Sequence, residues 1–367
     1  MQPRSNTTKG FTLLELMVAV ALGLIVLAAT TQLFKSGMDA TILVSQQSEM
    51  QQSVRSALNL IAKDVSMAGS GLPSGGLSLP NGTGSVASFF AVDPNRAWLA
   101  NNTYPSGTVG GAPVSNYMYG IIPGPNNGLE QGGPTTIPAT GQGADAVTVI
   151  YTDYSFPLDQ YTITFPAGNP NGDAIDVAPP ANPPAGFPAI LSPTGIQVGD
   201  LILLSNTRGP AVGEVTGISN AGGRITFADA DSLKVNQSGA LNGNIKYIVT
   251  GSNTVARRIW AVTYFIEVPQ NGQPPRLMRQ VSGQNPSPVA DNIIGLKVTY
   301  DLCDGTNGPS CGSVSDPIGN SYSPNQINKV NIQVIGQTLN SYGNRSKSMA
   351  LMTSVSTRSL SFKDRYQ

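Results

Sequence analysis

The chain has 367 residues, and its 21 Lys and Arg balance its 21 Asp and Glu, so its formal net charge is zero. This balance argues against a nucleic-acid-binding protein that relies on a broadly basic surface. Histidine is absent, which removes the commonest general base and the commonest metal ligand. We therefore expect no enzymatic activity, no cofactor or metal, and no small-molecule substrate.

The N-terminus combines a short polar segment with a long apolar one. Residues 1–10 carry Arg4 and Lys9 without an acid, and residues 11–34 are apolar apart from Glu15 and a few Thr and Gln. About 20 helical residues, each rising 1.5 Å, cross the roughly 30 Å of a bilayer core. Basic residues on the N-terminal side favour a cytoplasmic N-terminus. The sequence therefore predicts a single membrane span followed by an exported region.

Glu15 is the unusual residue of this span, because a carboxylate inside the bilayer costs about 2.5 to 3.5 kcal/mol. No Lys or Arg lies within residues 11–34. Cleavage before Phe11 would create an α-amino group four residues before Glu15, about 6 Å away along a helix. This amine is the expected partner of Glu15, either in the same chain or between neighbouring chains.

Residues 9–15, with the sequence KGFTLLE, resemble the class III signal of type IV prepilins and type II secretion pseudopilins. The resemblance implies that a prepilin peptidase cleaves after Gly10 and methylates Phe11, and that Glu15 acts in assembly. It also implies other pilin subunits as partners, an inner-membrane location before assembly, and a periplasmic or extracellular pilus afterwards. The alternatives are a plain signal anchor and a secretory signal peptide cut after Ala21, inside the apolar run.

The helix is expected to continue to about residue 68. Apolar residues follow one another in steps of three and four: Met50, Val54, Ala57, Leu58, Ile61 and Val65. The polar residues between them, among them Lys63 and Asp64, are expected to face water, and Gly69 and Gly71 to end the helix. The expected organisation is a leader at 1–10, a transmembrane and assembly helix at 11–68, and an exported β-rich head at 69–367. Residues 60–69 further resemble the helix end of minor pilins of the PilW type.

The whole chain contains 41 glycines and 28 prolines, and such a composition favours strands and long loops. We expect irregular loops at residues 69–143 and 166–195. Runs rich in β-branched and aromatic residues predict strands at 146–151, 161–165, 201–204, 224–227, 245–249, 259–268, 276–281, 293–302, 330–335 and 348–362. The Asn271-Gly272 pair predicts a hairpin between 259–268 and 276–281. Residues 260–362 are similar in strand order to the C-terminal sheet of PilW-type minor pilins and larger pseudopilins.

Cys303 and Cys311 are the two cysteines of the chain. Both lie in the region expected to be exported, where oxidising conditions favour disulfides, so we predict a bridge between them. Asp301, Asp304, Asn307 and Asp316 supply oxygens near this loop, but their spacing fits no EF-hand. Solvated turn residues are the favoured interpretation over a calcium site.

Four arginines, Arg257, Arg258, Arg276 and Arg279, lie near the expected hairpin. Contact with DNA phosphates is one interpretation, and the favoured one is that they pair with acids or line a subunit contact.

The resemblance and the pattern of the chain together predict an α+β, pilin-like fold, with a long N-terminal helix packed on an antiparallel sheet and large Gly/Pro-rich insertions. The predicted function is that of a minor pilin-like structural subunit, incorporated into a type IV pilus or priming its assembly. The alternatives are a type II secretion pseudopilin and a pilus-borne adhesin whose loops bind a surface.

Overall fold

The computed structural model describes residues 10–73, 75–80, 108–109, 112–113, 117–129, 136–138, 140–219, 223–229, 231, 233, 235–236, 238–240, 243–270, 272–282, 284–302, 312–318, 322–338, 346–357 and 360. The chain divides into two units. One comprises residues 1–49 with 338–347, and the other comprises residues 50–337 with 348–367.

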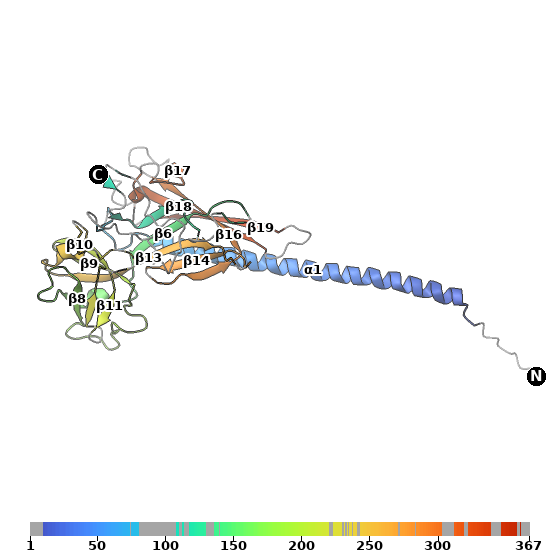
Figure 1. Cartoon of the computed structure of the whole chain (residues 1–367), viewed down its shortest axis with the longest axis horizontal. Coiled ribbons are helices and arrows are strands. Elements are labelled where there is room, and N and C mark those ends of the chain that lie inside the picture. The colour runs from blue at the N-terminus through green and yellow to red at the C-terminus, as the bar shows by residue number, and fades with distance from the viewer. Residues whose placement is uncertain are drawn as a thin grey trace, which may run out of the picture. The chain divides into compact units, whose positions relative to one another are not determined.

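One long helix, α1 (Leu13–Ser66), fills the N-terminal part of the described chain (Figure 1). It falls within the predicted range of 11–68. Its apolar residues up to Ile42 are exposed. From Met50 onward, the six apolar residues predicted to form a stripe are all buried. The helical spacing of this stripe therefore predicted the buried face correctly.

The largest sheet has seven antiparallel strands. Five of them lie in the order β10 (Gly209–Glu214), β9 (Leu201–Asn206), β13 (Val255–Glu267), β14 (Arg276–Val281) and β15 (Ser287–Asp291). β6 (Ala146–Thr152) pairs with β13, and β5 (Ile121–Gly124) pairs with β6. The predicted hairpin is confirmed, since β13 and β14 pair antiparallel over Val262–Glu267 and Arg276–Val281.

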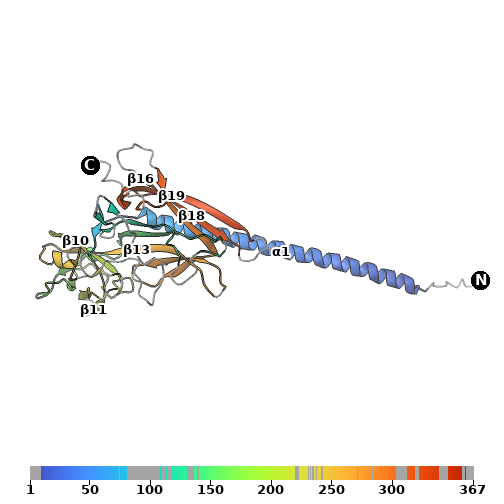
Figure 2. The same cartoon turned by 45° about the horizontal axis from the view of Figure 1, so that its top comes forward.

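The described chain also forms two four-stranded antiparallel sheets. The first has the order β17 (Ser313–Val314), β16 (Ile293–Leu302), β18 (Ile327–Gln337) and β19 (Ser348–Ser356), and Figure 2 shows β19 beside β18. The second has the order β11 (Gly217–Ser219), β12 (Arg224–Thr226), β8 (Ala174–Ala178) and β7 (Thr162–Thr164). Two-residue strands form two small pairs, β1 (Leu77–Ser78) with β4 (Tyr117–Met118) and β2 (Thr108–Val109) with β3 (Ala112–Pro113).

The main hydrophobic core lies between the buried stripe of α1 and the sheets. It includes Val149 of β6, Val262 of β13, Leu296 of β16 and Val334 of β18. Alternate residues of β6 and β13, such as Ile150, belong to a second core. The seven-stranded sheet is therefore buried on both faces at its centre, as the alternation of side chains along a strand requires. Each fully buried aliphatic side chain contributes about 1.5 to 3 kcal/mol.

Gly336 on β18 lies directly against the side chains of Met50 and Val54 on α1. A Cβ atom at this position would lie 2.5 Å from Cγ2 of Val54 and 3.1 Å from Cγ of Met50. Glycine without a side chain is thus what lets α1 pack directly on β18.

One strand prediction was wrong, and both regions expected to be irregular contain strands, β5 within residues 69–143 and β8 within residues 166–195. Residues 245–249 form a 3₁₀-helix at Ile245–Ile248 instead of a strand. Side chains three residues apart coincide on a 3₁₀-helix, and both end residues of this turn are buried. Residues 166–195 were expected to be irregular, yet they contain β8, whose Ile175 is fully buried. The predicted α+β class, with one long N-terminal helix and antiparallel sheets, is confirmed.

Candidate functional site

Gly10 and Phe11 lie directly before α1, outside regular structure. Phe11 is 87% exposed, and Gly10 is exposed as well. A Cβ atom built on Gly10 would meet no atom within 4 Å. The fold of the described chain therefore does not itself require glycine here.

Thr12 and Glu15 form a capping box at the start of α1. The backbone N–H and the hydroxyl of Thr12 donate to Oε2 of Glu15 over 2.9 and 3.0 Å, and the N–H of Glu15 donates to Oγ1 of Thr12 over 3.3 Å. Sequence reasoning considered only an amine as the partner of Glu15. The sequence does indicate the pairing of Thr12 with Glu15, because Thr-x-x-Glu before an apolar run is the sequence pattern of a capping box.

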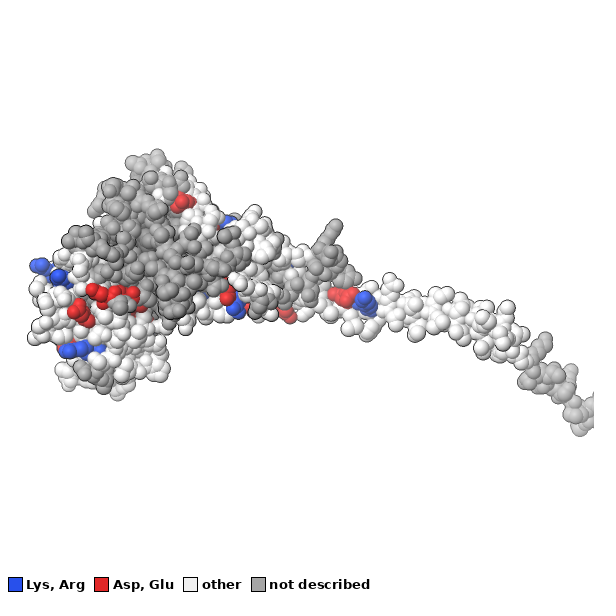
Figure 3. Space-filling view, in the orientation of Figure 1, with Lys and Arg blue, Asp and Glu red and all other residues white. Residues whose placement is uncertain are grey.

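The stretch of α1 after Glu15 has the properties of a membrane span. Its most apolar 18-residue window has a mean hydropathy of 2.5, and none of that window is buried. In the view of Figure 3, most of this stretch shows no charged side chain. By length and composition it can cross a bilayer as a helix.

Comparisons with known proteins bear on this segment. The family model described as the prokaryotic N-terminal methylation motif matches residues 5–31. This chain carries the N-terminal methylation motif. The motif contains Gly10, Phe11 and Glu15 and ends within the apolar part of α1.

Among solved structures, a type IV-like pilin from Thermus thermophilus is similar at 12% identity, over 45% of this chain and 87% of that one, with a TM-score of 0.17. A TM-score this low carries no argument about the fold. No curated protein matches the chain. The methylation motif is thus the informative similarity, and it concerns the N-terminal segment alone.

Asp64, far along α1 from the methylation motif, is the centre of a buried polar cluster. Its carboxylate accepts hydrogen bonds from the hydroxyls of Tyr151, over 2.9 Å, and Tyr264, over 2.5 Å. Nε of Arg279 lies 3.1 Å from Oδ2 of Asp64. The prediction that Asp64 faces water was wrong, since it is only 3% exposed. It lies seven residues after Ala57 and three after Ile61, so its spacing places it on the apolar stripe.

The protonation of this cluster follows from its surroundings. Burial, and next the negative charge of Asp64, raise the pKa of both Tyr151 and Tyr264 above its ordinary value. Both hydroxyls therefore remain protonated and donate to the carboxylate. The cluster joins α1 to β6, β13 and β14 through one side chain.

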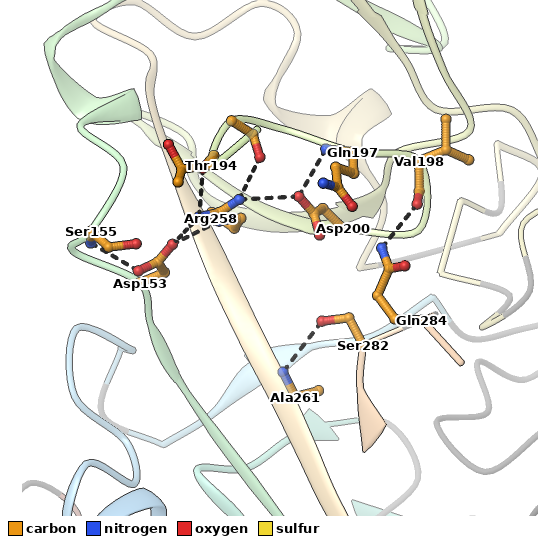
Figure 4. A network of polar contacts seen from close by, with 11 residues as sticks. Asp153, Ser155, Thr194, Gln197, Val198, Asp200, Arg258, Ala261, Ser282 and Gln284 are labelled. Atoms are coloured by element: carbon orange, nitrogen blue, oxygen red, sulfur yellow. Dashed lines mark hydrogen bonds and ion pairs between the residues drawn. The ribbon is translucent and has the colours of Figure 1, made fainter. Parts of the chain in front are cut away.

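Arg258 on β13 organises a second polar network (Figure 4). Its Nε donates to Oδ2 of Asp153 over 2.7 Å, and Nη1 donates to the carbonyl of Gly195 over 2.6 Å and lies 3.4 Å from Oδ2 of Asp200. Nη2 donates to the carbonyl of Thr194 over 3.2 Å. Burial raises the pKa of Asp200. Arg258 thus fastens the loop at 194–200 to the centre of the large sheet.

All four arginines singled out in the sequence have acidic partners. Besides the pairs of Arg258 and Arg279, Arg257 lies 3.7 Å from Asp159, and Arg276 pairs with Glu267. The favoured interpretation was that these arginines pair with acids or line a subunit contact, and its first part is confirmed.

Glu214 and Asp231 are buried together at the end of β10, a pairing that the sequence did not indicate. The N–H of Leu233 donates to Oε2 of Glu214 over 2.8 Å, and the N–H of Val235 donates to Oδ2 of Asp231 over 2.6 Å. Burial, and next the charge of Glu214, raise the pKa of Asp231 to about 8. The buried pair of Glu214 and Asp231 therefore retains a proton at neutral pH.

The cysteines and half of the oxygen-rich loop lie outside the described residues, namely Cys303, Cys311, Asp304 and Asn307. The disulfide stays a prediction. Asp301 at the start of this loop accepts a hydrogen bond from Nδ2 of Asn331 over 2.8 Å and lies 3.4 Å from Nζ of Lys329. These contacts fix Asp301 to β18.

Proposed function

We propose that this chain is a minor type IV pilin-like subunit, which is processed at its N-terminus and acts by assembly. The observation that carries the proposal is the methylation motif at residues 5–31, placed at the start of a helix whose apolar part is exposed. Side chains such as Leu24 and Phe34, 61% and 71% exposed, need a bilayer or other helices to cover them.

In this proposal, a prepilin peptidase cleaves after Gly10 and methylates Phe11, and the bulk of the chain lies outside the inner membrane. The exposed linkage ahead of α1 suits such a cleavage. Before assembly, the carboxylate of Glu15 is satisfied by Thr12. After cleavage, the new amine of Phe11 attracts the same carboxylate, in the same chain or in the neighbouring subunit of a filament.

A low-copy position is favoured by the size of the head. The described part of the head contains three separate hydrophobic cores, and a head of this size would be hard to accommodate in every layer of a filament. Incorporation near a tip or in a priming complex avoids this crowding. A type II secretion pseudopilin would use the same N-terminal segment, and recovery in secretion pseudopili instead of pili would identify it.

The test is mass spectrometry of the mature N-terminus in cells that contain a prepilin peptidase. We expect the first residue to be N-methylated Phe11. Gly10→Val is the matched variant, because a side chain at this position meets nothing within the described chain. It should keep a folded head and retain the leader. A mature start at Leu22, or an intact Met1 in the wild type, would refute the proposal.

A further inference from the structure

Residues 231–236 fold back on the end of β10, an edge strand of the large sheet. Of this segment, residues 231, 233, 235 and 236 are described. The N–H of Glu214 donates to Oδ1 of Asn236 over 2.8 Å, and Nδ2 of Asn236 donates to the carbonyl of Glu214 over 2.6 Å. One amide side chain thus satisfies both backbone groups of a β10 residue, as a neighbouring strand would.

Two carboxylates hold the backbone of the same segment. Oε2 of Glu214 accepts the N–H of Leu233 over 2.8 Å. Asp231 accepts the N–H groups of Val235, over 2.6 Å, and Asn236, over 3.2 Å. Glu214 is 4% and Asp231 6% exposed, and a hydrogen bond joins their side chains. Ionised carboxylates only accept hydrogen bonds, so this bond requires a proton on one of the two.

Leu233 and Val235 form the apolar side of this segment. They are 2% and 0% exposed and belong to the second hydrophobic core, together with Leu77, Leu79 and Met118. Their N–H groups are the ones that donate to Glu214 and Asp231. The polar and apolar contacts of the segment therefore form and break together, and the segment covers the second core while the two carboxylates hold its backbone.

No described base compensates the charge of Asp231. Among the described residues, no Lys or Arg lies within ion-pair distance of it. Asp229 is exposed and accepts hydrogen bonds from Ser238, and Lys246 is exposed. β1 and β9, which lie beside β10, carry no charged residue, and Asp200 ahead of β9 pairs with Arg258. Lys234 lies outside the described residues.

The pH dependence of this arrangement follows from its proton count. Burial, and next the charge of Glu214, raise the pKa of Asp231 to about 8, against about 3.9 for a carboxyl in water. Between these two values the closed segment holds one proton that the open segment has released. Each pH unit therefore favours opening about tenfold, up to about pH 8, and a higher pH adds nothing further.

We propose that Glu214, Asp231 and Asn236 form a pH-sensitive clasp, which holds residues 231–236 over the second core in acid and releases them as the pH rises through the neutral range. Release turns Leu233 and Val235 out of the core and bares the apolar side chains beneath them. The clasp does not involve the methylation motif. That an exported head meets the pH of its surroundings rests on the proposed function, whereas the clasp itself does not.

The test is hydrogen exchange of the purified full chain in detergent, read by mass spectrometry of peptides that cover residues 228–240. Rates are measured from about pH 5 to about pH 9 and divided by the intrinsic rate at each pH. We expect the protection of this segment to fall about tenfold per pH unit up to about pH 8 and then to level off. Peptides of β13 should stay at least about tenfold better protected at every pH, because the clasp opens without unfolding of the sheet. A flat profile at residues 228–240, or protection equal to that of β13, would overturn the clasp.

Glu214→Gln is the decisive variant, because an amide N–H can donate to Asp231 as the shared proton does and does not titrate. We expect the protection of its segment to be independent of pH. Asp231→Asn removes the other carboxyl and should flatten the profile as well, so the clasp stays testable if one of the two variants fails to fold. The wild-type slope in either folded variant would contradict the proposal.

Two further variants control for a change of charge alone. Asp229→Asn removes an exposed acid close to the segment, and Lys234→Gln removes the base that lies between Leu233 and Val235 in the sequence. Both should keep the wild-type slope. Loss of the slope in either control would assign the titration to that residue and overturn the role of Glu214 and Asp231.

Discussion

The carboxylate of Asp64 lies 2.5 Å from the hydroxyl of Tyr264, although the two residues are 200 positions apart in the chain. This contact, with the ion pair to Arg279, fixes the buried part of α1 to the large sheet. Removing one partner of such a cluster leaves a buried charge without compensation.

Asp64→Ala should lower the free energy of unfolding by about 3 to 5 kcal/mol, because the partly buried Arg279 would lose its acidic partner and the hydroxyls of Tyr151 and Tyr264 would lose their acceptor. Tyr264→Phe should cost less, about 1 to 3 kcal/mol, since one hydrogen bond to a charged group is lost. Urea unfolding measures both. Lys63→Gln, one residue away on the exposed side of α1, is the control and should change little. Equal stability of Asp64→Ala and Lys63→Gln would show that the cluster does not hold the helix.

Gly336→Ala should destabilise the protein by about 1 to 3 kcal/mol, the usual cost of overpacking. The added methyl group would lie 2.5 Å from Val54, so α1 must move away from β18. Gly239→Ala is a matched control, because its Cβ would meet nothing within 4 Å. Thermal unfolding should give a lower midpoint for Gly336→Ala than for Gly239→Ala. Coincident unfolding curves would contradict the close packing of α1 on β18.

The pH dependence of stability should report the buried pair of Glu214 and Asp231. The pKa of Asp231 is raised to about 8 in the folded chain, against about 3.9 when unfolded. The folded state thus binds more protons in this window, and stability falls as pH rises from about 4 to about 8. The measurement is the urea midpoint across this range. Asp231→Asn removes the titrating group and should flatten the dependence, whereas an unchanged slope would exclude Asp231 as its source.

Glu15→Ala should leave membrane insertion and leader removal intact and reduce entry into filaments, because the charge that attracts the amine of Phe11 is gone. Thr12→Ala breaks the same capping box, at a cost of about 0.5 to 2 kcal/mol, but keeps the carboxylate. The amounts of the two variants in sheared filaments are compared. A defect in Glu15→Ala alone would show that the charge of Glu15 acts in assembly, independently of its role in the helix cap. Similar defects in both variants would mean that Glu15 acts through the helix cap.

Cys303 and Cys311 are predicted to form a disulfide in the exported protein. The described residues beside them are already paired, since Asp301 lies opposite Ser313 and the N–H of Leu302 donates to the carbonyl of Gly312 over 3.3 Å. Cys303→Ser should lower stability by about 2 to 3 kcal/mol in the chain-entropy model without affecting leader removal. Thiol labelling of the wild type under non-reducing conditions checks the bond, and two reactive thiols would contradict it.

The sequence by itself determined the features that depend on neighbours along the chain. The motif around Gly10 and Phe11, the apolar span and the stripe from Met50 to Val65 follow from local order and the 3.6-residue period of a helix. The hairpin at Asn271-Gly272 follows from turn chemistry. In each case the residues that decide the structure lie within one or two turns of each other.

Only the tertiary structure decided the rest. Asp64 is buried because its partners arrive from strands 87 to 215 positions away, and a polar residue gives no local sign of such partners. Residues 245–249 have the composition of a strand, yet no neighbouring strand pairs with them among the described residues, and they coil into a 3₁₀-turn. The position of β19 as the last strand of its sheet likewise depends on the order in which the strands pair. That order is set by long-range pairing, and therefore by contacts that no local pattern contains.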